Sequence, residues 1–142
     1  MEELTGLDAR FLYSETATAH MHTLKVLVVD VTGRSEALTP GLLANLLAER
    51  LDRMPGLRRR VVTARRRISH PVWIETPFDP ADHIRWCRVD APGDRAALAQ
   101  VVAEVAATPL DRDRPLWEDV VVEGLADLQI AFVVKLHHAL AD

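Results

Sequence analysis

Apolar residues recur along the chain with two different periods. From Leu4 to Glu15 they have helical spacing, which predicts a short helix. A second helix is expected to begin at Thr39 and Pro40, because a hydroxyl caps a helix well and proline is tolerated in its first turn. A third helix is predicted after Asp94 and is expected to end before Pro109.

Runs of apolar and β-branched residues predict strands between these helices. The expected strands cover residues 23–31, 57–64, 72–76, 84–89, 117–123 and 128–137. The run at 23–31 is so continuously apolar that we expect it to be buried over most of its length. Helices and strands mix without strict alternation, which favours a single α+β domain over residues 1–142 rather than a doubly wound α/β fold.

The last predicted strand has the most informative pattern. Alternate strand residues face opposite sides of a sheet, so this strand divides into two rows. One row contains Leu128, Ile130, Phe132, Val134, Leu136 and His138, and the other contains Gln129, Ala131, Val133, Lys135 and His137. Because the first row is the more apolar, we expect His138 to enter an apolar interior.

Composition narrows the class of protein. The 142 residues are 49% hydrophobic and 27% charged, which excludes intrinsic disorder. A single cysteine, Cys87, cannot form an internal disulfide, and the N-terminus lacks the pattern of a secretory signal, so we expect a cytoplasmic protein. A net charge of −4 argues against nucleic acid as a partner. No apolar stretch is long enough to span a membrane.

The histidine pair near the C-terminus is the best candidate for chemistry. A histidine titrates near neutrality, so His138, with Asp142 four residues later, is a candidate general base. A buried histidine that only satisfies a hydrogen bond would give the same pattern. A metal site is disfavoured, because adjacent strand residues point to opposite faces and no further ligands lie nearby. We therefore expect no metal.

Six arginines form a separate basic cluster within ten residues. They are Arg58, Arg59, Arg60, Arg65, Arg66 and Arg67. The cluster can be the solvated face of a hairpin, or it can bind an anionic membrane surface. Binding of the CoA phosphates is a weaker alternative, and nucleic acid is weaker still because stacking aromatic side chains are missing.

Several motifs resemble those of one family. Residues 135–142, Lys-Leu-His-His-Ala-Leu-Ala-Asp, look like the HHxxxDG signature of the bacterial wax ester synthase/diacylglycerol acyltransferase family. The N-terminal opening Leu7-Asp8-Ala9-Arg10-Phe11-Leu12 with Met21-His22, and the PLW motif Pro115-Leu116-Trp117 within residues 109–118, are also similar. Pro71-Val72-Trp73, Phe78-Asp79 and His83 stand between them in the family's order.

The resemblance implies a fold and an activity. The fold would be half of a chloramphenicol-acetyltransferase-like or condensation-domain-like structure, a mixed sheet with flanking helices. Members transfer a fatty acyl group from acyl-CoA to the hydroxyl of diacylglycerol or of a long-chain alcohol. Acyl-CoA is a co-substrate, and no further cofactor is implied. A peripheral position on a membrane or lipid droplet would suit such substrates.

The resemblance also implies residue roles. His138 would take the proton of the acceptor hydroxyl, His137 would support it, and Asp142 would order the loop after the strand. Pro115, Leu116 and Trp117 would bind substrate or pack beside it, although a tryptophan that begins a strand is more often part of a core. The neighbouring Asp111, Arg112, Asp113 and Arg114 are expected to form weak surface ion pairs.

Family members are several hundred residues long, so the chain is expected to supply only their N-terminal half. Its exposed half-interface is then expected to cause self-association. The alternative is a truncated, noncatalytic fragment that binds lipid surfaces or a partner half.

Overall fold

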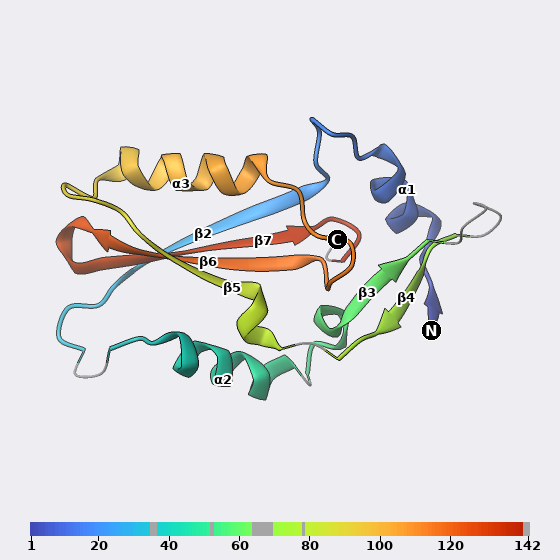
Figure 1. Ribbon diagram of the computed structural model, residues 1–142, viewed down its shortest axis with the longest axis horizontal. Coiled ribbons are helices and arrows are strands. Elements are labelled where there is room, and N and C mark those ends of the chain that lie inside the picture. The colour runs from blue at the N-terminus through green and yellow to red at the C-terminus, as the bar shows by residue number, and fades with distance from the viewer. Residues whose placement is uncertain (35–36, 52, 64–69, 78, 141–142) are drawn as a thin grey trace.

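The computed structural model describes residues 1–34, 37–51, 53–63, 70–77 and 79–140. The strands among them form two sheets (Figure 1). The larger sheet has the order β2-β7-β6-β5. Its strands are β2 (His22–Asp30), β5 (Ile84–Arg88), β6 (Trp117–Leu125) and β7 (Gln129–His137). Strands β5 and β6 are parallel and the other pairs are antiparallel, so the sheet is mixed, as predicted.

The smaller sheet lies near the N-terminus, at one end of the molecule (Figure 1). It has the order β1-β4-β3 and consists of β1 (Glu2–Glu3), β3 (Arg59–Val62) and β4 (Val72–Glu75). Strand β1 is too short to leave a periodic signal and was not predicted. A core that includes Leu4, Leu12, Val61, Trp73 and Leu116 joins this sheet to the first helix.

Three helices flank the sheets. The predicted starts at Thr39–Pro40 and after Asp94 are confirmed, whereas the first helix begins at Gly6 rather than at Leu4. Helix α1 is Gly6–Ser14, α2 is Pro40–Leu51 and α3 is Arg95–Ala107. The side chains of Thr5, Thr39 and Asp94 accept hydrogen bonds from backbone N–H groups of the first turns. Short 3-10 helices cover Pro55–Arg58, Pro80–His83 and Ala126–Leu128.

The two faces of the larger sheet differ. Helix α3 packs its Val105 against Val120, Val122, Ala131 and Val133, and we call this side the α3 face. The opposite side, beside α2, carries Trp117, Asp119, Val134 and Leu136, and we call it the cavity face. His138 directly follows β7 and continues its half-buried row. The α3 face is closed by the helix, whereas β7 residues on the cavity face are only half-buried.

The prediction about the rows of β7 was wrong in one respect. Alternation assigned the two rows correctly within β7, although Leu128 and His138 lie just outside the strand. The row with Lys135 and His137 is the buried one, at 0% and 1% exposure. His138 lies on the half-buried row and does not enter a closed interior. The reason is that α3 covers the face that carries Lys135, and apolar content within β7 does not record where that helix packs.

The expected burial of the strand at 23–31 was also wrong. Strand β2 lies at the edge of the larger sheet, where it pairs with β7. Residues Val26 to Val29 are consequently 36–51% exposed. An apolar sequence is typical of a central strand, but β2 has no further strand on its outer side among the described residues. Composition alone therefore did not reveal that β2 is an edge strand.

Candidate active site

His137 is the buried member of the histidine pair. Its Nδ1 accepts a hydrogen bond from the backbone N–H of Ala139 at 3.0 Å, so the neutral ring carries its proton on Nε2. Burial lowers the pKa of His137 to about 4, although the nearby Glu15 carboxylate opposes the shift. His137 is therefore a neutral side chain that fixes the turn after β7.

Glu15 and Arg112 close the space next to His137. The Arg112 guanidinium pairs with Glu15 and also donates to the Leu12 carbonyl at 3.1 Å. Glu15 Oε2 lies 3.8 Å from His137 Nε2. Burial opposes ionisation of Glu15, but the hydrogen bond and charge of Arg112 outweigh it and lower the pKa of Glu15. Arg112, expected to form only a weak surface pair, instead joins α1 to the histidine.

Lys135 fixes the same end of β7 to α3. Its ammonium is fully buried and donates to the carbonyls of Val105 at 3.0 Å and Thr108 at 2.8 Å. It also pairs with Glu118 Oε1 at 2.6 Å. The last carbonyls of a helix have no partners within the helix and favour a cation, so Lys135 completes the C-terminus of α3.

His138 lies on the opposite side of the strand. Its backbone N–H donates to the Met21 carbonyl at 2.9 Å, which continues the pairing with the segment before β2. Its ring stacks on Phe11 of α1, with centroids 5.1 Å apart and an interplanar angle of 24°. The neighbouring backbone and Phe11 thus hold a half-buried imidazole.

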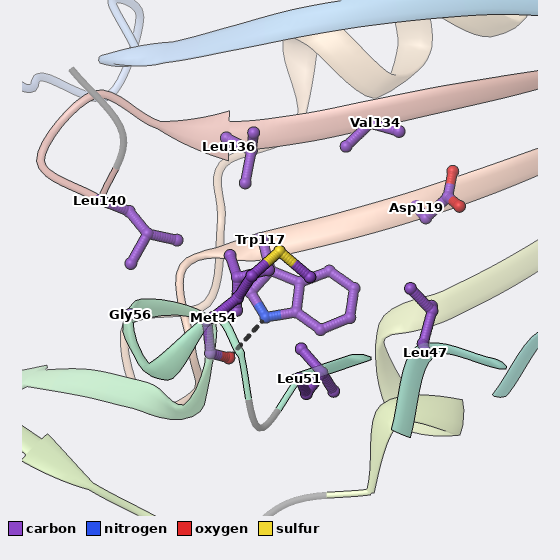
Figure 2. A pocket seen from close by; sticks show the side chains of 10 residues that line it. Leu47, Leu51, Met54, Gly56, Trp117, Asp119, Val134, Leu136 and Leu140 are labelled. Carbon is purple, nitrogen blue, oxygen red and sulfur yellow. Dashed lines mark hydrogen bonds between the residues drawn. The ribbon is translucent and has the colours of Figure 1, made fainter. Parts of the chain in front are cut away.

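A cavity of about 400 Å³ opens on the cavity face, between α2 and strands β6 and β7 (Figure 2). It is lined by Leu47, Leu51, Met54, Gly56, Leu57, Trp117, Asp119, Val134, Leu136 and Leu140. Trp117 is held in its wall by a hydrogen bond from Nε1 to the Leu57 carbonyl at 2.9 Å. Asp119 is the acidic residue in this otherwise mostly apolar wall.

The residues of the PLW motif have different positions. Trp117 borders the cavity, whereas Leu116 is fully buried and packs in the core next to α1. Pro115 is also buried. The structure thus places Trp117 where a bound molecule could touch it and gives Leu116 a packing role, and substrate binding by the three residues stays a prediction.

Some predicted residues lie outside the described part of the chain. They are Asp142, Arg65, Arg66, Arg67 and Phe78. Within the described residues, no three His, Cys, Asp or Glu side chains gather closely enough to hold a metal ion. No helix within those residues is long and apolar enough to cross a membrane.

Comparison with known proteins identifies the family. Residues 4–142 match the family model described as the wax ester synthase/diacylglycerol acyltransferase catalytic domain. The chain belongs to this family. The resemblance of its motifs is therefore confirmed over nearly the whole sequence.

Relatives and solved structures agree with this assignment. A Mycobacterium tuberculosis protein named "Putative diacyglycerol O-acyltransferase Rv0221" is 45% identical over all of this chain and 30% of its own length. The wax ester synthase/diacylglycerol acyltransferase of Marinobacter aquaeolei VT8 is 28% identical, with a TM-score of 0.84 over all of this chain and 34% of its own. The chain thus spans about a third of the length of these relatives.

A condensation domain shares the fold at greater distance. The first condensation domain of the calcium-dependent antibiotic synthetase is 19% identical, with a TM-score of 0.73 over 96% of this chain and 32% of its own. This likeness confirms the condensation-domain-like α+β fold that the motifs implied.

Three residues around the end of β7 were given no role in the site from the sequence alone. Glu15 ends the first predicted helix, Arg112 stands in a charged loop, and Lys135 lies in a strand. A lysine within an apolar strand is the one signal that was available, because an unpaired charge there would be costly. The Glu15–Arg112 pair joins residues 97 positions apart and leaves no local pattern.

Proposed function

We propose that the protein transfers a fatty acyl group from acyl-CoA to the hydroxyl of diacylglycerol or of a long-chain alcohol. The products would be triacylglycerol and wax ester. His138 is the general base of the proposed reaction, and His137 is a positioning residue.

In this reaction the imidazole of His138 accepts the proton of the acceptor hydroxyl, and the oxygen attacks the thioester carbonyl carbon. Collapse of the tetrahedral intermediate forms the ester and breaks the carbon–sulfur bond. The imidazolium then returns its proton to the leaving CoA sulfur. One base serves both proton transfers, so no covalent acyl-enzyme is needed.

The placement of His138 is the observation that carries the proposal. Its ring is half-buried and stacks on Phe11. It lies two residues from Leu136 and from Leu140, which both line the apolar cavity. The neighbouring His137 is engaged by Ala139 and kept neutral by burial, so it is poorly suited to accept a further proton. Asp142 keeps its predicted role in ordering the loop as part of this proposal.

Acyl transfer measured with labelled palmitoyl-CoA tests the proposal. Diacylglycerol and hexadecanol are offered in parallel to the wild type, to His138→Ala and to His70→Ala, an exposed histidine that serves as control. General base catalysis contributes about 10²–10⁴-fold, so we expect His138→Ala to lose that much while His70→Ala keeps its activity. Activity retained by folded His138→Ala would show that the base is another residue.

A second candidate function is a noncatalytic segment that binds lipid or a partner segment. The apolar cavity would suit a lipid chain without any transfer step. Folded wild-type chain that forms no product, yet binds acyl-CoA or lipid vesicles, would support this alternative.

The proposed substrates are lipids, so we also propose that the arginine cluster holds the protein on an anionic membrane or lipid-droplet surface. Arg58 ends the 3-10 helix before β3, and Arg59 and Arg60 begin that strand. Arg59 is partly neutralised by Glu2 at 2.5 Å. Changing Arg58–Arg60 and Arg65–Arg67 to Gln should weaken binding to anionic vesicles at low salt, whereas Arg85→Gln on β5 should not. Unchanged binding by the first variant would remove this part of the proposal.

We also propose that the chain self-associates through β2. The exposed apolar residues Val26 to Val29 form an outer edge of the larger sheet, which is a template for pairing with another chain. We expect sedimentation to show concentration-dependent association that Val28→Lys reduces. A wild-type chain that stays monomeric at high concentration would contradict it.

A further inference from the structure

One polar group in the cavity is not explained by the proposed reaction. Asp119 is 7% exposed and lies on β6, where its register partner is Val134 of β7 (Figure 2). Its Oδ1 is buried and, among the described residues, has no hydrogen-bond partner. A buried acceptor without a partner costs stability, and the lining around it is mostly apolar. An occupant that donates a hydrogen bond to Asp119 would remove that cost.

Asp119 is too far from His138 to contact the reacting hydroxyl. Val134, opposite Asp119, is four residues before His138, which directly follows β7. At about 3.3 Å per residue, this spacing corresponds to roughly 13 Å along β7. If the reacting carbon of a bound substrate lies beside His138, a substrate group that contacts Asp119 must therefore be attached part-way along an extended alkyl chain.

We propose that this cavity binds an alkyl chain that carries a mid-chain hydroxyl, and that Asp119 accepts the hydrogen bond of that hydroxyl. The proposal rests on the proposed acyl transfer and assigns a substrate class to its site. The apolar lining removes the chain from water, and Asp119 selects hydroxylated chains over plain ones. Asp119 is a specificity-determining residue and takes no part in the proton transfers at His138.

The state of the carboxyl agrees with this role. Burial raises the pKa of Asp119 to about 6, although a hydrogen bond from backbone Val120 opposes the rise. The carboxylate is thus poorly solvated when the cavity holds no donor. A hydroxyl beside Oδ1 would stabilise the ionised form and lower the pKa again.

Binding of two matched alcohols tests the proposal without any transfer step. Ricinoleyl alcohol has a mid-chain hydroxyl that oleyl alcohol lacks, and titration calorimetry with the wild-type chain should show about tenfold tighter binding of ricinoleyl alcohol. In Asp119→Leu the preference should vanish or reverse, whereas Glu49→Leu, which removes an exposed carboxylate of α2, should keep it. An equal preference in wild type and Asp119→Leu, or no binding of either alcohol, would overturn the proposal.

A measurement on the wild type keeps the test valid if Asp119→Leu does not fold. Carbon-13 NMR of the labelled Asp119 carboxyl should show its pKa fall when ricinoleyl alcohol binds and not when oleyl alcohol binds. The same response to both alcohols would overturn the proposal.

Transfer assays then assign the source of the hydroxylated chain. One arm compares ricinoleyl with oleyl alcohol as acceptors for palmitoyl-CoA, and the other compares ricinoleoyl-CoA with oleoyl-CoA as donors to hexadecanol. The arm in which the preference for the hydroxylated chain is lost in Asp119→Leu shows whether the cavity binds the acceptor or the acyl chain. If no arm gives product but the binding preference is present, the proposed function fails and the hydroxyl site stands.

Discussion

The two faces of the larger sheet treat adjacent histidines in opposite ways. On the α3 face, His137 is closed in by Ala139, Glu15 and Arg112. His138, which directly follows β7 and continues its half-buried row, stacks on Phe11 instead. The contacts of His137 fix the end of the strand, whereas His138 stays partly accessible. The two histidines differ in this way because adjacent strand residues point to opposite faces.

The difference teaches how a fixed base can be built at the end of a strand. Lys135 and His137 fix the end of β7 from its α3 face, through charge-assisted hydrogen bonds of Lys135 and a hydrogen bond from backbone to His137. The reactive ring then needs few contacts of its own. A displacement of about 1 Å in such a site can cost on the order of 10²-fold in rate, so the closed face matters for chemistry on the open one.

The largest effect on the closed face is expected from Lys135→Met. The change leaves Glu118 without its partner and two carbonyls of α3 without a donor. Loss of one partner of a buried pair destabilises a fold by about 3 kcal/mol, which urea unfolding would measure. The matched control is Lys25→Met on β2, an exposed site where we expect a change below about 0.5 kcal/mol. Equal effects of the two changes would show that the contacts of Lys135 contribute little.

The two faces should also respond to pH in opposite directions. The pKa of His137 falls from 6.5 to about 4 on folding, so its contribution to stability is complete above about pH 6.5 and is lost as the pH falls through 4. The pKa of Asp119 rises from 3.8 to about 6, so its contribution is complete below about pH 3.8 and is lost as the pH rises through 6. Each is worth up to about 3 kcal/mol, and the two act in opposite directions over this pH range.

Variants separate these two contributions. Between about pH 4 and 6, the free energy of unfolding of Asp119→Asn should increase with pH, and that of His137→Gln should decrease. Parallel curves for the two variants would contradict the assignment of a neutral His137 and a raised pKa for Asp119.

A smaller effect is expected from Glu15→Gln. The change removes the charge that pairs with Arg112 and faces His137. We expect a loss of about 2 kcal/mol in unfolding free energy and a fall in kcat with little change in KM, because the base is displaced while substrate binding is kept. Asp111→Asn is the control, because Asp111 forms an exposed ion pair with Arg114, 3.6 Å away, which should contribute little to stability. A change in KM alone would indicate that Glu15 binds substrate.

Much of the fold could be predicted from local patterns. Thr39 and Asp94 identify helix starts because capping depends on the nearest backbone, and the alternation of β7 separates His137 from His138 correctly. The choice of the buried face could not be predicted, because it depends on α3 packing over Lys135 from about thirty residues upstream. The exposed edge at β2 has the same origin, since strand order is a property of the whole sheet.

The candidate site was predictable only where a motif is local. The histidine pair and the PLW segment are each a contiguous stretch of sequence. The structure pairs Trp117 with Leu136, two residues before His138. Glu15 and Arg112 reach His137 through long-range packing that no spacing in the sequence reveals. Asp119 was within a predicted strand, but its significance depends on a cavity that forms only when α2 lies beside β6.

The most direct test of the division between the histidines is the protonation of His137, measured by nitrogen-15 NMR of its ring between about pH 5 and 7. The structure predicts a neutral ring with its proton on Nε2 throughout this range, unchanged in His138→Ala. A His137 ring that is protonated near pH 6, or that carries its proton on Nδ1, would contradict the account.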